Sequence, residues 1–173
     1  MRTLIVVDIE SDGPCPGLFS MVCFGAVAVT RELNKTFYAE TQAIEGAKWQ
    51  PEALAISGIS RERHLAMPFP TVAMNNFDAW LRQFERPVFI SDNLAFDWQF
   101  TNWYFHAFGP SGNPFGWSGR RIGDIYGGFK QDIRVPWKNK FRKTAHTHNP
   151  VDDAMGNAEA LVAFADLGIK GIL

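Results

Sequence analysis

The chain has 173 residues, of which 46% are hydrophobic and 20% are charged, and its formal net charge is -1. This length allows one sizeable core and is short for two, so we expect a single domain spanning residues 1–173. No stretch approaches the roughly 18 to 20 uninterrupted apolar residues of a membrane span, and no secretory signal pattern is present, which predicts a soluble, cytoplasmic protein. Cys15 and Cys23 form no metal-binding pattern and are expected to be reduced thiols.

Four apolar segments are predicted to be β-strands. They cover residues 4–9, 21–29, about 36–39 and 87–91. The first two are continuously apolar, as strands covered on both faces are, so we expect helices on both sides of the sheet. Residues 11–17 are dense in turn-forming residues and predict an irregular loop between the first two strands.

Two helices are predicted in the middle of the chain. Residues 71–84 place apolar side chains close to helical spacing, and residues 95–108 form an aromatic-rich segment that ends at a Gly-Pro pair. Residues 109–143 are poorly periodic, and we expect only a short strand or a turn of helix around residues 121–126. The alternation of helices and strands predicts one mixed sheet in an α/β sandwich.

A third helix is predicted near the end of the chain. Asn149 can cap it, Pro150 fits its first position, and Asp152 lies in the first turn, where the helix dipole favours an acid. An apolar stripe then continues to residue 165. This helix carries Asp153, which shares a face with Asn157 away from that stripe.

Positive charge is concentrated in residues 120–143. This segment has eight basic and two acidic residues, a net charge of +6, which leaves -7 on the rest of the chain. Trp137 and Phe141 alternate with the basic residues, and aromatic faces beside cations suit the bases and phosphates of single-stranded nucleic acid. The alternative is a solvated charged loop with no such partner.

Two acidic residues close the first predicted strand. Side chains two apart on a strand point to the same face, so Asp8 and Glu10 project together. Like charges held this close raise each other's pKa, and a bound divalent cation would remove the repulsion. Exposure to water is the alternative, and for an isolated pair it is the more common arrangement.

Three further residues strengthen the metal-site interpretation. Asp97 lies near the start of a predicted helix, and His148 precedes Asp153 by five residues. A histidine just before a helix can reach water held by a metal at Asp153, and it titrates near neutral pH, as a general base should. Each residue alone has an ordinary structural explanation, but together they contain the parts of a phosphodiester-hydrolysing site.

These residues form a known pattern. The motifs are Asp8-x-Glu10, Phe24-Gly25-Ala26-Val27, Asn93-x-x-x-Asp97 and His148-x-x-x-x-Asp153. In order and separation they resemble those of the DEDDh exonucleases, which include oligoribonuclease and polymerase proofreading subunits. The resemblance implies a ribonuclease-H-like mixed five-stranded sheet, with the first three strands antiparallel, flanked by helices.

The resemblance also implies a mechanism and its residues. Two divalent cations, Mg²⁺ or Mn²⁺, would be held by Asp8, Glu10, Asp97 and Asp153, with Asp8 shared between them. His148 would deprotonate the attacking water, and 5′-nucleotides would be released from a 3′ end. All five residues are therefore candidate catalytic residues, and the four acids are candidate metal ligands.

The chain departs from the pattern in two places. Ser57 stands where many relatives have a histidine near the terminal nucleotide, and the loop after Glu10 has an unusual sequence. In the family this loop contacts the last base and sugar, a role that falls here to Leu18 and Phe19, although Phe19 is equally suited to a core. With Asn93, these are the candidate substrate-binding residues.

The sequence leaves three functions open. The first is a 3′-to-5′ exonuclease on single-stranded nucleic acid, with RNA favoured over DNA or short oligonucleotides. The second is a nucleic-acid-binding module with a silent site, and the third is an enzyme acting on a small phosphorylated metabolite. A homodimer is a further option, because the aromatic-rich helix offers apolar surface to cover, unless its rings fill the core.

Overall fold

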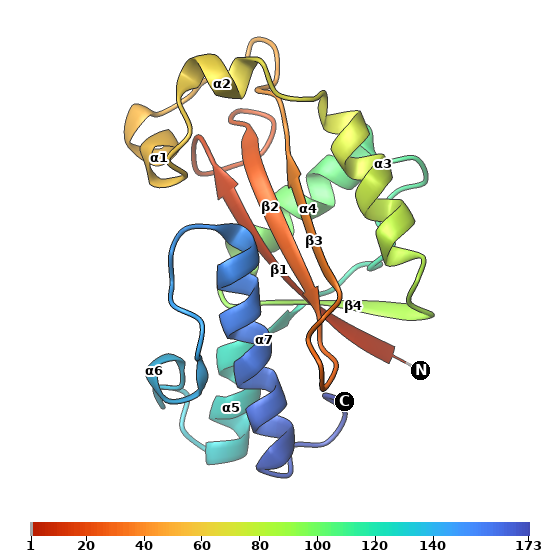
Figure 1. Cartoon of the computed structure of the whole chain (residues 1–173), viewed down its shortest axis with the longest axis vertical. Coiled ribbons are helices and arrows are strands. Elements are labelled where there is room, and N and C mark those ends of the chain that lie inside the picture. Colours follow the sequence, from red (N-terminus) through yellow and green to blue (C-terminus); the bar gives the residue numbers. More distant parts are fainter. Residues whose placement is uncertain (1) are drawn as a thin grey trace.

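The two continuously apolar segments become the middle strands of a mixed sheet in the computed structural model, which describes residues 2–173 (Figure 1). The strands are β1 (Arg2–Ser11), β2 (Met21–Ala28), β3 (Thr36–Glu40), β4 (Arg86–Ser91) and β5 (Arg120–Arg121). Their order is β3-β2-β1-β4-β5, with β1, β2 and β3 antiparallel and β4 parallel to both β1 and β5. The predicted mixed sheet of five strands is confirmed.

Helices cover both faces of this sheet (Figure 1). On one face lie α3 (Pro70–Leu81) and α4 (Leu94–Phe108), and on the other lie α5 (Ile122–Lys130) and α7 (Pro150–Asp166). Both helices predicted in the middle of the chain are present within a few residues, and the Asn149 side chain accepts a hydrogen bond from the Val151 N–H at the start of α7, as expected. The poorly periodic segment contains both β5 and α5.

The core has one layer on each face of the sheet, and these layers show toward which face Asp8 and Glu10 of β1 point. Val7 and Ile9 pack in the core under α3 and α4, whereas Leu4 and Val6 pack in the core with α7. Because side chains alternate along a strand, Asp8 and Glu10 continue the α7 side of β1. The acidic pair and the helix that carries Asp153 therefore share one face of the sheet.

Three short helices were not predicted from the sequence. They are α1 (Pro51–Ile56), α2 (Arg61–Leu65) and α6 (Lys138–Phe141). Helices of four to six residues show too little periodicity for a pattern to reveal, and their stability comes from packing. Figure 1 shows α1 and α2 at the end of the sheet where β1 finishes.

The structure corrects the role inferred for Trp137 and Phe141. Trp137 is 6% exposed, and both rings pack against Phe164 of α7, with centroid separations of 6.1 and 5.1 Å. Their surfaces are therefore used in the core and are not free to stack on bases. The aromatic residues alternate with basic ones because the segment turns these two rings inward and leaves all of its basic residues except Arg142 exposed.

Two expectations from composition concern the whole chain. No helix in residues 2–173 is long and apolar enough to cross a membrane. Cys15 and Cys23 are both free, and Cys23 is buried in β2. Burial raises the pKa of the Cys23 thiol to about 12, so it packs as a small hydrophobic side chain.

Candidate active site

Three acids from two distant segments meet at the end of β1. The carboxylates of Asp8, Glu10 and Asp153 each offer an oxygen within 4.8 Å of the others. Asp153 lies in the first turn of α7 and is 1% exposed. Three carboxylates this close form an oxygen-rich site of the kind that Mg²⁺ and Mn²⁺ prefer.

Gly25 allows this meeting. It pairs with Asp8 across the β1–β2 ladder, and the start of α7 lies directly on it. A Cβ atom placed on Gly25 would be 2.5 Å from the backbone carbon of Pro150 and the backbone nitrogen of Val151, closer than real contacts allow. Only glycine lets the helix come near enough to the strand for Asp153 to join the acidic pair.

We expect Gly25→Ala to destabilise the protein by about 1 to 3 kcal/mol, because the methyl group would push the helix start away from β2. The same shift would separate Asp153 from Asp8 and weaken metal binding. Urea unfolding monitored by circular dichroism measures the loss. Gly128→Ala is the matched control: its added methyl meets nothing within 4 Å, and in a helix it should leave stability unchanged or raise it slightly.

The fourth acid comes from α4. Asp97 is 3% exposed and accepts a 3.2 Å hydrogen bond from the Ile9 backbone N–H, which ties the start of α4 to β1. It lies outside the 4.8 Å group, yet its charge raises the pKa of Asp8. Asn93 occupies the N-cap position of α4 without a capping hydrogen bond from its side chain, and it is exposed.

Burial and mutual repulsion disfavour the charged form of these acids. Burial is the main cause that raises the pKa of Asp8 well above its ordinary value, and the charges of Asp97, Asp153 and Glu10 add to it. Burial also raises the pKa of Asp97 to about 8 and that of Glu10 to about 7. Without a cation, the site therefore retains protons at neutral pH, and a divalent ion would displace them.

The metal-free protein should lose stability as the pH rises from about 4 to about 8. A carboxyl whose pKa is higher in the folded than in the unfolded state binds its proton more tightly when folded, so deprotonation favours unfolding. The loss starts above the ordinary values of 3.8 and 4.5, and runs to about 7 for Glu10 and about 8 for Asp97. Urea unfolding in EDTA checks this, and a saturating concentration of Mg²⁺ should flatten the dependence.

Arg142 neutralises part of the cluster, a role that no pattern in the sequence indicates beyond its place in the basic segment. Its guanidinium donates a 3.0 Å hydrogen bond to Asp153 Oδ1, and the two side chains are only 10% and 1% exposed. Gly156 makes room for this arginine, because a Cβ there would be 2.5 Å from its Nε. The arginine charge also lowers the pKa of Asp8.

The loop before α7 holds both Asp153 and His148 in place. The backbone N–H groups of Thr147 and His148 donate to Asp153 over 3.3 and 3.1 Å. His148 has φ of +59°, an uncommon conformation for a residue other than glycine, and its Nδ1 lies 3.7 Å from Glu10 Oε1. The imidazole is half exposed, so it borders both the acids and solvent.

A hollow of about 230 Å³ lies beside Glu10, and none of the four candidate substrate-binding residues is among the residues that line it. Leu18 is 48% exposed, whereas Phe19 is 7% exposed with its ring under Gly13, so little of that ring is available to a ligand. The Ser57 hydroxyl donates a 2.7 Å hydrogen bond to the Leu54 carbonyl at the end of α1. Ile56 and Phe96 line the hollow instead.

Asp12 anchors the loop that follows Glu10, a role that sequence reasoning missed. It is fully buried, accepts a 2.6 Å hydrogen bond from the Ser20 N–H, and pairs with Arg61 of α2 at 3.1 Å. His64 lies 3.6 Å from the same carboxylate and is also buried. The loop is therefore tied to α2 by buried polar contacts, which fixes one wall of the site.

A mixed sheet with acids from β1, α4 and α7 gathered at the end of its central strand defines a ribonuclease-H-like nuclease of the DEDDh type. No protein-family model matches the chain. The chain is, however, 36% identical over 174 residues to the 3′-5′ DNA exonuclease Cap18 of Escherichia coli, covering 92% of this chain and 91% of that protein. This protein belongs to the DEDDh exonuclease superfamily.

Solved structures agree on the fold. The nuclease domain of 3′hExo, a DEDDh family member bound to rAMP, has a TM-score of 0.75 at 14% identity, covering 97% of this chain and 94% of that one. Cell-death related nuclease 4 (CRN-4) has a TM-score of 0.76 at 14% identity, covering 96% of this chain and 64% of that one. At such identities the likeness concerns the fold alone.

Proposed function

We propose that this protein is a metal-dependent 3′-to-5′ exonuclease that removes 5′-nucleotides from single-stranded nucleic acid. The observation that carries the proposal is the meeting of Asp8, Glu10 and Asp153 within 4.8 Å, with Asp97 beside them. Asp8, Glu10 and Asp97, whose pKa values are raised by burial, are expensive to keep unless a ligand uses them. His148 lies at the open side of the same cluster.

The donor set fits two divalent cations. Asp8, Glu10 and Asp153 would hold one ion, and Asp8 and Asp97 the other, directly or through water. All of these ligands are carboxylate oxygens, which favours Mg²⁺ or Mn²⁺ over softer ions. When bound, such a pair activates a water and stabilises the oxygen that departs from phosphorus.

His148 is the proposed general base. Its ring borders Glu10 on one side and solvent on the other, so it can take a proton from a water at the acids and release it outward. The hydrogen bond from the His148 N–H to Asp153 keeps the residue in its left-handed conformation. The carboxylate that binds metal would thus also position the base.

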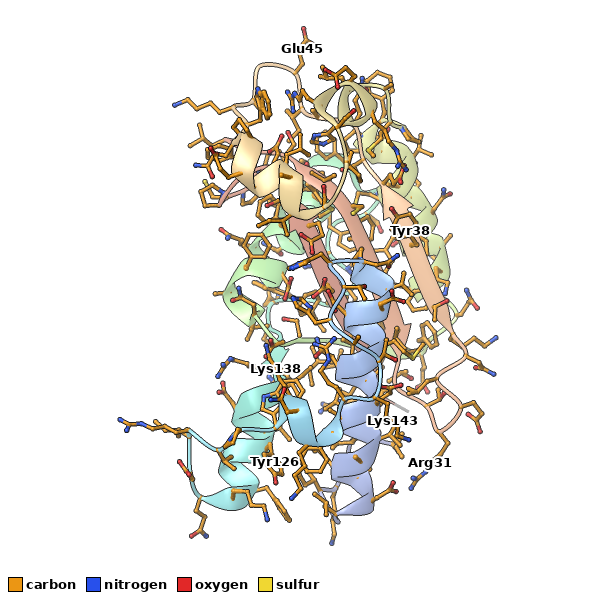
Figure 2. The ribbon with its side chains drawn as sticks, turned by 60° about the vertical axis from the view of Figure 1, so that its left-hand side comes forward. Arg31, Tyr38, Glu45, Tyr126, Lys138 and Lys143 are labelled. Atoms are coloured by element: carbon orange, nitrogen blue, oxygen red, sulfur yellow. The ribbon has the colours of Figure 1, made fainter. Side chains whose placement is uncertain are left out.

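Two adjoining hollows are proposed to hold the phosphates upstream of the 3′ end. One, of about 380 Å³, is lined by Lys138, Arg142 and Lys143, and the other, of about 390 Å³, by Arg121, Arg134 and Lys138. Figure 2 shows Lys138 and Lys143 on the segment beside α7. Trp137 also lines the second hollow but is only 6% exposed, so positive side chains dominate both. Such side chains suit backbone contacts, which carry no base preference.

We further propose that the strand is DNA. The sequence favoured RNA, but the relative that is 36% identical is named a DNA exonuclease. Matched DNA and RNA oligonucleotides labelled at the 5′ end, incubated with Mg²⁺ or Mn²⁺, test both statements. A ladder shortened from the 3′ end supports the activity, and faster shortening of DNA supports the choice of strand, whereas faster shortening of RNA restores the original expectation.

The same assay separates the other two functions. Tight binding with no shortening in either metal would favour the silent binding module. Cleavage of a simple phosphodiester, but of neither oligonucleotide, would favour the small-metabolite enzyme. A cytoplasmic location and a homodimer remain predictions from the sequence.

A further inference from the structure

A second group of potential metal ligands lies beside the carboxylate cluster and shares one residue with it. His146, His148 and Asp153 each offer a ligand atom within 4.8 Å of the others. His146 Nδ1 is 2.7 Å from Asp153 Oδ1, and the two imidazole rings are 4.4 Å apart between centroids. His146 belongs to none of the motifs that carry the exonuclease resemblance.

The chemistry of this group differs from that of its neighbour. Two imidazole nitrogens and one carboxylate oxygen are ligands for Zn²⁺ and similar transition ions, whereas Mg²⁺ prefers oxygen ligands alone. Three protein ligands also leave a coordination position open to water. The two neighbouring clusters therefore favour different metals.

The shared carboxylate is already oriented for such a site. Asp153 receives hydrogen bonds from Arg142 and from the backbone N–H groups of Thr147 and His148. Ligating carboxylates are characteristically held by such outer contacts, which fix their orientation toward the ion. His146 and His148 are 58% and 47% exposed, so an ion from solvent can reach them.

We propose that His146, His148 and Asp153 bind one Zn²⁺ ion, and that this ion inhibits the exonuclease by occupying its general base and one of its metal ligands. The binding follows from the ligand group alone, while the inhibition rests on the proposed function. Zinc at this position would occupy the nitrogen lone pair with which His148 would otherwise accept a proton. It would also compete for the carboxylate that Mg²⁺ needs.

Binding is tested without any nucleic acid. Co²⁺, whose visible absorption reports coordination by nitrogen ligands, is titrated into protein in excess Mg²⁺, and Zn²⁺ is titrated by calorimetry. Wild type and the control His106→Asn, an exposed histidine on α4, should each bind one equivalent. His146→Asn should bind at least about tenfold more weakly. Equal affinity in His146→Asn, or no binding by wild type, overturns the site.

Inhibition is tested by adding Zn²⁺ to Mg²⁺-supported hydrolysis of a labelled oligonucleotide. Each variant is compared with its own rate in the absence of zinc. The zinc concentration for half-inhibition should rise at least about tenfold in His146→Asn and stay unchanged in His106→Asn. An unchanged value in His146→Asn overturns the inhibitory role. If no variant hydrolyses the oligonucleotide, the proposed function fails, and the cobalt titration still decides the metal site.

Discussion

Asp8→Asn should lower the exonuclease rate by about a thousandfold and at the same time stabilise the metal-free protein. The rate falls because Asp8 is the carboxylate placed between the other acids, and an amide cannot replace its charge toward two cations. The stability rises because burial, and then the neighbouring acids, disfavour the charged form of Asp8, so the metal-free protein must bind a proton there in order to fold. A neutral amide removes that cost. A gain of about 1 kcal/mol would raise the melting temperature by about 2 to 4 °C.

Two measurements on the same preparation test this pair of effects. Shortening of a 5′-labelled oligonucleotide in Mg²⁺ gives the rate, and thermal unfolding in EDTA gives the stability. Asp166→Asn is the matched control, because this aspartate is exposed on α7 and pairs with Arg31 at the far end of the helix. Activity near the wild-type level in Asp8→Asn would exclude the proposed metal site, whereas a lower melting temperature would show that the Asp8 carboxyl does not destabilise the metal-free fold.

The acids that meet at the site could be predicted because the prediction of each one depends only on nearby residues in the sequence. The alternation of side chains put Asp8 and Glu10 on one face, and helix spacing chose Asp153 over Asp152. Asp152 instead interacts with the Thr147 hydroxyl at 3.0 Å, away from the acidic group. The five-stranded sheet with its first three strands antiparallel followed from the resemblance to a family and not from the residues alone, and the order of the strands came only from the structure.

Other features depend on contacts that no short pattern contains. Arg142 pairs with a residue eleven positions away, across a loop with no periodicity, so its burial could not be read from its charged neighbours. Trp137 and Phe141 were placed on the surface for the same reason, since an irregular segment does not reveal which way its side chains face. The close approach of α7 to Gly25 could be recognised only once the position of α7 was known.

The contact between Arg142 and Asp153 offsets part of the negative charge of the acidic cluster when no cation is bound. Arg142 is the buried cation beside Asp153, and it partly opposes the pKa increase of Asp8. A bound divalent ion would supply positive charge at nearly the same place. The arginine and the metal are therefore expected to substitute for each other in stabilising the folded state, although only the metal can serve the reaction.

Arg142→Met should accordingly destabilise the metal-free protein by about 3 to 5 kcal/mol, because it leaves the buried Asp153 carboxylate without its charged partner. Saturating Mg²⁺ should recover much of this loss, and Asp153→Asn in the same chain should recover part of it without metal. Urea unfolding of both single variants and the double variant, with EDTA or Mg²⁺, measures the coupling.

Arg121→Met serves as the stability control for that experiment. Arg121 pairs with Asp124 in an exposed i,i+3 contact, so its loss should cost less than about 1 kcal/mol and show no dependence on metal. If Arg142→Met behaved like this control, the ion pair with Asp153 would add little to the metal-free fold. A large loss that Mg²⁺ failed to reduce would mean that Arg142 supports the loop before α7 mainly by packing on Gly156, and not through its charge.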